Sequence, residues 1–444
     1  MTDNHPKKKF SIISCAIVVV VGVWIFYSCN VFFSYYFIAV SIILIIVLIN
    51  RIEDPVLRKI IYIALVIRLG LALLQTYTGI DLPGEGPGSD AINFENHGWK
   101  NAQYWLQGGE PGGMTGAHYY SAWIGILYYI FGRISLVPQI FNVYFSLLAI
   151  FLVYKTTNMI AKQRAARFAA LFFMLIPSLN SFAAILLRET LIILFLTASF
   201  YFFVKWLYNG KILDIGGAFI AVALAGALHG VLFLLSAIYI IMLIFYSPRE
   251  KRFRLVWTQL ILAGVMVILA FVLLSNIISY QIPANVADVF TPEFIGTVVE
   301  RKKVSRTSYL QGMVPQNYFD LIWQSPIRMI YFLFAPFPWM VENISDLFGF
   351  LDILIYVVLI VLSVKGSCLL WPGKKQVVST AAVLVFSLVL MYSWGTTNYG
   401  TAWRHRQKLA AYLTIFAAVG VTRIHKLKGL FPEDDIIMKT RGQD

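Results

Sequence analysis

Long runs of apolar residues constrain this chain more than any other feature of its sequence. Three of them, Ile12–Tyr27, Tyr35–Ile49 and Leu255–Leu274, contain no charged residue. A helix needs about 20 apolar residues to cross the hydrocarbon core of a bilayer. Only 13% of all residues are charged, against roughly 25% in a soluble domain. The pattern excludes an ordinary soluble enzyme and predicts an all-α, polytopic integral membrane protein with roughly 11–13 transmembrane helices.

The charge distribution predicts how these helices are oriented. The net charge is +14, and the basic clusters Lys7–Lys9 and Arg249–Arg254 follow the positive-inside bias of cytoplasmic loops. No basic stretch forms a separate domain, so nucleic acid is not an expected partner. Two large polar loops, about 79–118 and about 279–325, are then expected outside the cytoplasm.

The sequence divides into three regions. Residues 1–59 are expected to form a transmembrane hairpin and a cytoplasmic turn, residues 60–422 the main transmembrane domain, and residues 423–444 a cytoplasmic tail. The individual spans are expected near 10–28, 32–50, 60–78, 119–132, 138–155, 167–183, 185–207, 212–228, 230–246, 255–278, 347–364, 376–395 and 408–422.

Parity limits how many of these segments cross completely. Six full crossings between residues 118 and 247 would place Arg249–Arg254 outside. One of the six segments should therefore be interfacial, re-entrant or fused to its neighbour. The stretch 326–345 carries three prolines and poses the same question. If it lies along the outer interface, the basic stretches at 365–375 and 423–428 both lie inside.

The first large loop carries acidic residues beside a membrane surface. Asp90, Glu95 and His97 lie close together in GSDAINFENHGW, and the pattern from Asp90 onward predicts a short helix. A carboxylate at the water–lipid boundary can take a proton from an attacking hydroxyl. Asp90 and Glu95 are therefore the predicted catalytic residues, and a solvated acidic loop is the structural alternative.

Charged and polar residues also interrupt apolar runs further along the chain. Arg188 and Glu189 end the run IPSLNSFAAILLRE, and His229 lies alone in GALHGVLF. Charges inside a membrane segment are costly and usually face a cavity or each other. Arg188 could hold a phosphate and Glu189 a sugar hydroxyl. A local ion pair and a packed histidine are the structural alternatives.

A basic cluster precedes the last apolar segment. It lies in NYGTAWRHRQK and contains Arg404, His405, Arg406 and Lys408. Under the parity argument the cluster faces outward, against the positive-inside bias. Arginine suits two-pronged contacts with phosphate oxygens. The cluster is therefore a candidate site for an anionic lipid headgroup, and a cytoplasmic anchor to acidic lipids is the alternative.

Three of these features together resemble the polytopic GT-C superfamily of glycosyltransferases. They are Asp90 in the first outer loop, the helix, basic turn, helix, proline and charged pair over residues 137–189, and NYGTAWRHR before the terminal helix. The resemblance covers roughly residues 60–422. It implies an integral membrane glycosyltransferase that acts on the outer face of the bacterial plasma (inner) membrane. The implied donor is a sugar on a polyprenyl phosphate, and the acceptor is a cell-envelope glycan or a lipid-linked molecule.

The resemblance also implies roles for particular residues. Asp90 would be the base or the group that orients the acceptor, and Arg404 or Arg406 would contact the lipid phosphate. The implied reaction requires no cofactor, and it leaves room for a divalent metal at Asp90 or Glu95. Three cysteines without paired spacing predict neither a disulfide framework nor a zinc site.

Two other functions remain open at this point. The order of Arg188, Lys211 and His229 is also similar to O-antigen and exopolysaccharide polymerases, which join undecaprenyl-pyrophosphate-linked repeats. That function would move the chemistry from Asp90 towards Arg188, His229 and Arg404–Arg406. A transporter or flippase of lipid-linked saccharides would need no bond chemistry. Transporters carry their charges near the midplane, whereas carboxylates in an outer loop favour an enzyme.

Overall fold

The computed structural model describes residues 30–80, 82, 90–109, 117–254, 257, 259–265, 268, 291–300, 305–424 and 431. This part of the chain is helical apart from two short antiparallel strands, β1 (Tyr246–Ser247) and β2 (Arg252–Phe253). Its helices are α2 (Asn30–Asn50), α3 (Pro55–Thr78), α4 (Asp90–Leu106), α5 (Ala117–Phe131), α6 (Leu136–Ile160), α7 (Gln163–Leu175), α8 (Pro177–Ala184), α9 (Glu189–Asn209), α10 (Ile212–Leu228), η1 (Gly230–Leu235), α11 (Ser236–Phe245), α13 (Pro292–Glu300), α14 (Tyr318–Phe334), η3 (Pro338–Met340), α15 (Ile344–Gly395), α16 (Tyr399–Arg406), η4 (Gln407–Leu409) and α17 (Ala410–Thr422).

Several of these helices confirm a polytopic membrane protein. Within the described residues, four are long and apolar enough to cross a bilayer, and a bent pair brings the number to five. The four lie at Phe32–Asn50, Leu136–Ile160, Glu189–Asn209 and Ile344–Gly395. The expected spans near 10–28 and 255–278 lie wholly or mostly outside the described residues, as does most of the predicted tail. The predicted count of roughly 11–13 crossings therefore stays a prediction.

The stretch with the parity problem contains a broken helix. α7 and α8 meet at an angle of 62°. Pro177 is the first residue of α8, and a proline lacks the N–H that would continue the helix before it. The side-chain amide of Asn180 donates to the carbonyl oxygens of Met174 and Ile176, which the break would otherwise leave unpaired. A broken or re-entrant segment is what the parity argument requires at one of these positions.

A buried arginine fixes this break in the helical bundle. Arg68 of α3 is fully buried, and it donates to Oδ1 of Asn180 and to Oγ of Ser146 in α6. Hydrogen bonds between polar side chains thus join three helices away from water, where most buried polar groups are paired. The short helix α8 then leads directly to Arg188 and Glu189 at the start of α9.

α17 is the central helix of the bundle. Its residues Ala410 to Val421 are all buried, which agrees with a helix that is apolar on every side. It packs along α15 through two glycines, because a Cβ on Gly366 would overlap the carbonyl oxygen of Phe416 and one on Gly420 that of Leu362. α15 combines the expected spans near 347–364 and 376–395, with non-helical backbone between them at Lys374.

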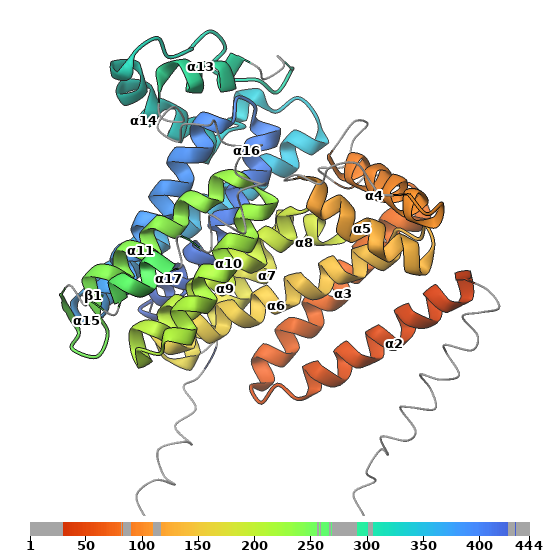
Figure 1. The fold of residues 1–444 in the computed structure, drawn as a ribbon, viewed down its shortest axis with the longest axis horizontal. Helices are drawn as coiled ribbons and strands as arrows, with labels where there is room; N and C mark the ends of the chain where they lie inside the picture. The colour runs from red at the N-terminus through yellow and green to blue at the C-terminus, as the bar shows by residue number, and fades with distance from the viewer. Residues whose placement is uncertain are drawn as a thin grey trace, which may run out of the picture.

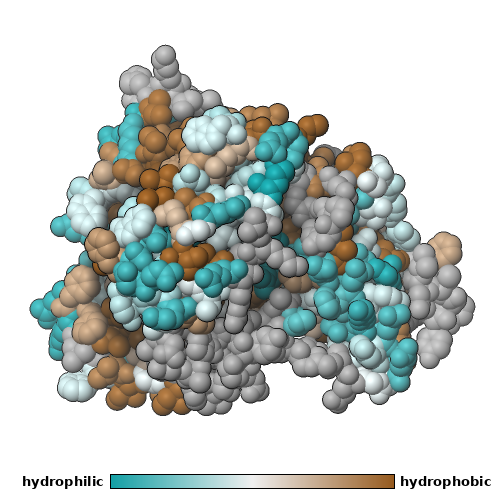
Figure 2. Space-filling view, turned by 90° about the horizontal axis from the view of Figure 1, so that it is seen from above, coloured by the Kyte–Doolittle hydropathy of each residue, from teal (hydrophilic) through white to brown (hydrophobic). Residues whose placement is uncertain are grey.

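The ends of the helices separate two faces of the molecule. Figure 1 shows α4 and α16 at the same end of the bundle, with α13 and α14 beyond α16, and β1 at the opposite end. α3 has 24 residues and is therefore about 36 Å long. Figure 2 views the end that carries α4 and α16, where hydrophilic residues gather in patches. Which of the two ends faces the cytoplasm stays a prediction from the sequence.

Candidate active site

The start of α4, which follows the first part of the first large loop, and the segment before the last helix meet at an ion pair. Nη1 of Arg404 in α16 donates to Oδ2 of Asp90, the first residue of α4, at 2.6 Å. The side chain of Arg404 is 17% exposed and that of Asp90 is 44% exposed. The two residues are 314 positions apart in the chain. The structure thus joins the acidic and basic groups that the sequence places on one side of the membrane.

A cavity of about 380 Å³ lies beside this ion pair. One face of α4 lines it, because Asp90, Asn93, Phe94 and His97 follow the spacing i, i+3, i+4 and i+7 that brings side chains to one side of a helix. The remaining lining residues are His118 and Ser121 of α5 and Arg188, which precedes α9.

Arg188 and Glu189 extend the site into the bundle. Nη1 of Arg188 donates to the carbonyl oxygen of Leu228 at 2.6 Å, and its guanidinium group lies over the ring of Phe94 at 5.6 Å. Glu189 is 1% exposed and interacts electrostatically with Arg404 and with Arg188. Burial by itself lowers the pKa of Arg404, but the carboxylates of Glu189 and Asp90 raise it above its ordinary value. Arg404 is therefore positively charged between two acidic groups.

Two histidines also belong to this cluster. The ring of His229 contacts the ring of His405 edge-on, with centroids 5.3 Å apart, and both rings also contact Tyr392 of α15. Nδ1 of His405 lies 2.8 Å from Nζ of Lys408, which in turn lies over the ring of Tyr392. Burial, and then the charge of Lys408, lowers the pKa of His405 well below its ordinary value, so His405 is neutral at pH 7.

The guanidinium groups of this cluster are suited to an anion. Arg188 and Arg404 lie beside the carboxylates of Asp90 and Glu189. Arginine makes two-pronged contacts with phosphate oxygens, and electrostatic interactions in a partly buried region are less screened than in water.

Buried contacts hold α16 in position. The carboxylate of Asp352, which is fully buried in α15, accepts from Nε1 of Trp403 at 3.0 Å and from the backbone N–H of Ser178 in α8. Arg406 is also fully buried, and it donates to the carbonyl oxygens of Phe332 and Ala335 at the end of α14. α16 is thus bound to α8, α14 and α15, and Arg406 contacts protein backbone there.

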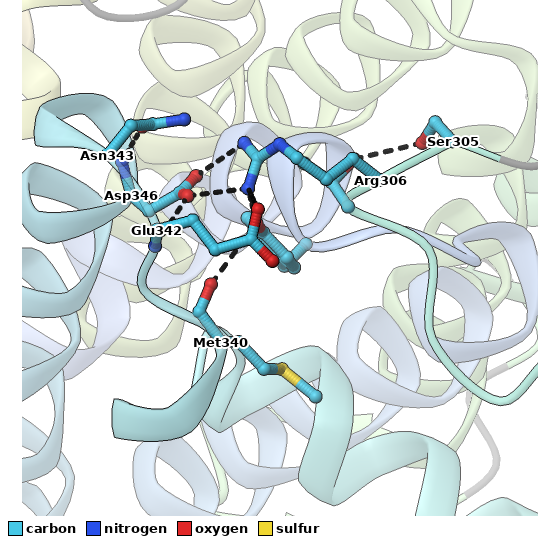
Figure 3. A network of polar contacts seen from close by, with 8 residues as sticks. Ser305, Arg306, Met340, Glu342, Asn343 and Asp346 are labelled. Atoms are coloured by element: carbon cyan, nitrogen blue, oxygen red, sulfur yellow. Dashed lines mark hydrogen bonds and ion pairs between the residues drawn. The ribbon is translucent and has the colours of Figure 1, made fainter.

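A second polar network ties the second large loop to the same helix. The guanidinium group of Arg306 donates to both carboxylate oxygens of Asp346, at 2.7 and 3.0 Å, and to Oη of Tyr399, the first residue of α16 (Figure 3). Glu342 lies 3.2 Å from the same group. The neighbouring backbone pairs too, since the N–H of Tyr399 donates to the carbonyl oxygen of Thr307. Asp346 raises the pKa of Arg306, so this arginine stays charged.

The structure brings most of the predicted site residues together. Asp90, Arg188, Glu189, His229, Arg404 and His405 belong to one connected cluster. Glu95 lies outside it and forms an exposed ion pair with Arg133, with Nε and Oε1 3.1 Å apart. Among the described residues, no three His, Cys, Asp or Glu side chains form a group that could hold a metal ion.

Sequence reasoning left some residues of the cluster without a role. Lys408 belongs to the basic cluster that the sequence indicates, but no role is assigned to it there. It follows His405 by three positions, about one helical turn. The spacing of Asn93, Phe94 and His97 from Asp90 gives a similar signal. No signal in the sequence indicates Tyr392 or His118, because they come from separate segments that only the tertiary structure brings to the site.

Comparison with a solved structure supports the fold. The chain is similar to the oligosaccharyltransferase of Archaeoglobus fulgidus in its apo form, with a TM-score of 0.52 and 12% sequence identity. The alignment covers 85% of this chain and 51% of the oligosaccharyltransferase, so the chain spans about half the length of that enzyme. Among curated proteins, no sequence matches this chain.

The fold defines a class of protein, a polytopic helical membrane protein. Within that class, residues 118–275 match the family model described as dolichyl-phosphate-mannose-protein mannosyltransferase. The matched stretch includes Arg188, Glu189 and His229, whereas Asp90 and Arg404 lie outside it. This partial match agrees with the predicted enzyme class.

Proposed function

We propose that the enzyme transfers the sugar of a polyprenyl-phosphate donor to a hydroxyl group of a cell-envelope acceptor. The transfer takes place on the outer face of a bacterial inner membrane. The observation that carries this proposal is the ion pair between Asp90 and Arg404 beside a cavity that Arg188 also lines. It joins a carboxylate that can accept a proton to guanidinium groups that can bind a phosphate.

The matching family suggests the first substrates to test. Its description names a mannosyl group on a lipid phosphate as the donor and a protein as the acceptor. Mannose is therefore the first sugar to test. A protein hydroxyl is therefore a further acceptor to test, beside the glycan and lipid-linked acceptors that are expected from the sequence.

The reaction that fits this arrangement is a displacement at the anomeric carbon. The acceptor oxygen forms a bond to that carbon while the bond from the carbon to the phosphate oxygen breaks. The proton of the acceptor hydroxyl passes to a carboxylate oxygen of Asp90, and the electron pair leaves with the polyprenyl phosphate. The leaving phosphate gains negative charge, so Arg404 and Arg188 stabilise the transition state more than the ground state.

The contact between Arg404 and Asp90 also couples donor binding to the acceptor. A phosphate that binds Arg404 competes with the carboxylate for the same N–H groups. Binding of the donor thereby frees an oxygen of Asp90 for the acceptor hydroxyl. Donor phosphate and acceptor proton are thus handled by neighbouring groups on α16 and α4.

The test is sugar transfer by the purified full-length protein in proteoliposomes. The donor is polyprenyl-phosphate mannose with a radiolabelled sugar, and envelope extracts supply the acceptor. Asp90→Asn should lower transfer at least about 100-fold, because a general base contributes this much. Glu293→Gln, which changes an exposed carboxylate of α13 in the same way, should leave transfer unchanged. Full transfer by Asp90→Asn would remove Asp90 from the mechanism.

One observation keeps the polymerase as a second candidate. The residues on which that function depends, Arg188, His229 and Arg404, lie in the same cluster as Asp90. The same proteoliposomes can be supplied with an undecaprenyl-pyrophosphate-linked repeat. Products that grow by whole repeats, together with no transfer from the monophosphate donor, would establish the polymerase.

A further inference from the structure

A groove lies at the end of the molecule opposite the candidate active site. It has a volume of about 800 Å³ and is formed by α2, α6, the start of α3 and the turn between α2 and α3. It includes Asp54, the residue that caps α3, and α3 leads from there to the outer loop over about 36 Å. The groove is therefore spatially separate from the site around Asp90.

The walls of the groove are apolar along the membrane-spanning part of α2 and α6. Ile45 and Leu48 of α2 face Leu148 of α6 across it, and Leu48 and Leu148 are exposed. α2 packs loosely, since only 17% of its most apolar window is buried. In a bilayer, apolar walls of this kind are covered by hydrocarbon chains.

The mouth of the groove is basic. Arg51 and Lys155 line it, both are exposed, and neither forms an ion pair with a carboxylate of the described residues. Two acidic residues also line the mouth. Asp54 is held by Arg167 at 3.0 Å and by Tyr154 and Gln163, whereas Glu53 is exposed.

The charge balance at the mouth therefore leaves an excess of one positive charge. Asp54 is neutralised by Arg167, and its hydrogen bonds hold its pKa at about 2 against the opposing effect of burial. Glu53 offsets only one of the two remaining cations, Arg51 and Lys155. Apolar walls below a basic mouth are complementary to one kind of molecule, a lipid with hydrocarbon chains and an anionic headgroup.

We propose that this groove binds an anionic phospholipid. Its acyl chains lie against Ile45, Leu48 and Leu148, and its phosphate lies between Arg51 and Lys155. The lipid fills the space between α2 and α6 and so attaches the loosely packed α2 to the bundle. Basic pockets between transmembrane helices on the cytoplasmic side commonly hold such headgroups.

The test measures lipid binding by the purified full-length protein in detergent. Phosphatidylglycerol and phosphatidylcholine with identical acyl chains are added separately, and native mass spectrometry and the Tm report binding. Phosphatidylglycerol should bind one to one and raise the Tm more than phosphatidylcholine. The double variant Arg51→Ala, Lys155→Ala should weaken phosphatidylglycerol binding on the order of tenfold or more, because each cation near a headgroup contributes about 1 kcal/mol.

A second variant tests the apolar walls without changing charge. Leu148→Trp places a larger side chain in the groove and should reduce the binding of both lipids. The matched control is the double variant Lys365→Ala, Lys375→Ala, which removes two exposed lysines of α15 outside the groove and should bind phosphatidylglycerol like the original protein.

Two results would overturn the proposal. One is unchanged binding of phosphatidylglycerol by both groove variants. The other is a mass that corresponds to two copies of the chain, lost in the same variants, which would make the groove an interface between protein copies. Because no sugar transfer is measured, either result leaves the proposed enzymatic function untouched.

Discussion

At the scale of single residues, a variant of Arg404 tests whether this arginine stabilises the leaving phosphate. Its guanidinium group lies between Asp90 and Glu189 beside the cavity. Arg404→Ala should lower kcat about 100- to 1000-fold, the effect of removing one donor that stabilises charge in a transition state. KM for the donor should rise less, because the leaving phosphate carries more charge than the bound one. Steady-state kinetics with a polyprenyl-phosphate sugar measures both constants.

Two further variants make the result for Arg404 specific. Arg404→Lys keeps the charge but loses the two-pronged geometry, so it should recover only part of the activity. Arg133→Ala removes an exposed arginine between α5 and α6, which pairs with Glu95, and should have little effect. An Arg404→Ala enzyme with normal kcat would exclude a role in stabilising the leaving group.

A variant of Glu95 tests whether the mechanism uses one catalytic carboxylate or two. It follows Asp90 by five positions on α4, which places it on a different face of the helix, beside Arg133. Glu95→Gln should therefore keep transfer within about threefold of the original rate, since exposed ion pairs contribute little. A loss as large as that of Asp90→Asn would restore the second carboxylate to the mechanism.

At the scale of elements, the clamp between Arg306 and Asp346 should control how α16 presents Arg404. It joins the second loop, the start of α15 and Tyr399 of α16. Arg306→Ala should lower the Tm by a few degrees, because it leaves Asp346, which is 5% exposed, without its cation. It should also lower kcat, whereas a purely structural role would move the Tm alone.

The matched variants for this clamp are Arg306→Lys and Glu342→Gln. Lysine can restore one of the two contacts to Asp346, so Arg306→Lys should recover part of the loss in Tm and part of the loss in kcat. The side chain of Glu342 is 61% exposed, so its contact with Arg306 should contribute little to the Tm. If Arg306→Ala changes neither the Tm nor kcat, the clamp does not position α16.

The elements that sequence could predict are those set by local chemistry. The apolar runs indicate α6, α9 and α17 nearly to their ends, and the proline at position 177 coincides with the break between α7 and α8. The hydrogen bond between Arg68 and Asn180 at that break joins two residues that are 112 positions apart in the chain. Composition and periodicity carry no information about such a pairing.

The candidate active site also combines features that the sequence indicates with features that only the structure shows. The sequence indicates charged residues at Asp90, Arg188 and Arg404, because charges are rare beside apolar segments. It does not distinguish Arg404 from Arg406, two positions away, since both suit a phosphate. The structure separates them, because Arg404 contacts Asp90 and Arg406 donates to backbone carbonyls at the end of α14.

At the scale of the whole molecule, the two sites require opposite faces of one membrane. The proposed active site lies at the end of the bundle with α4 and α16, and the proposed lipid groove at the end with Asp54. Single cysteines can be placed at Glu342 and at Lys59, both exposed, in a variant whose native cysteines are replaced by serine. In intact cells, a membrane-impermeant maleimide should label Glu342→Cys at once and Lys59→Cys only after the cells are opened. Labelling of both from the same side would contradict the separation of the two faces, and labelling in the reverse order would place the proposed transfer reaction in the cytoplasm.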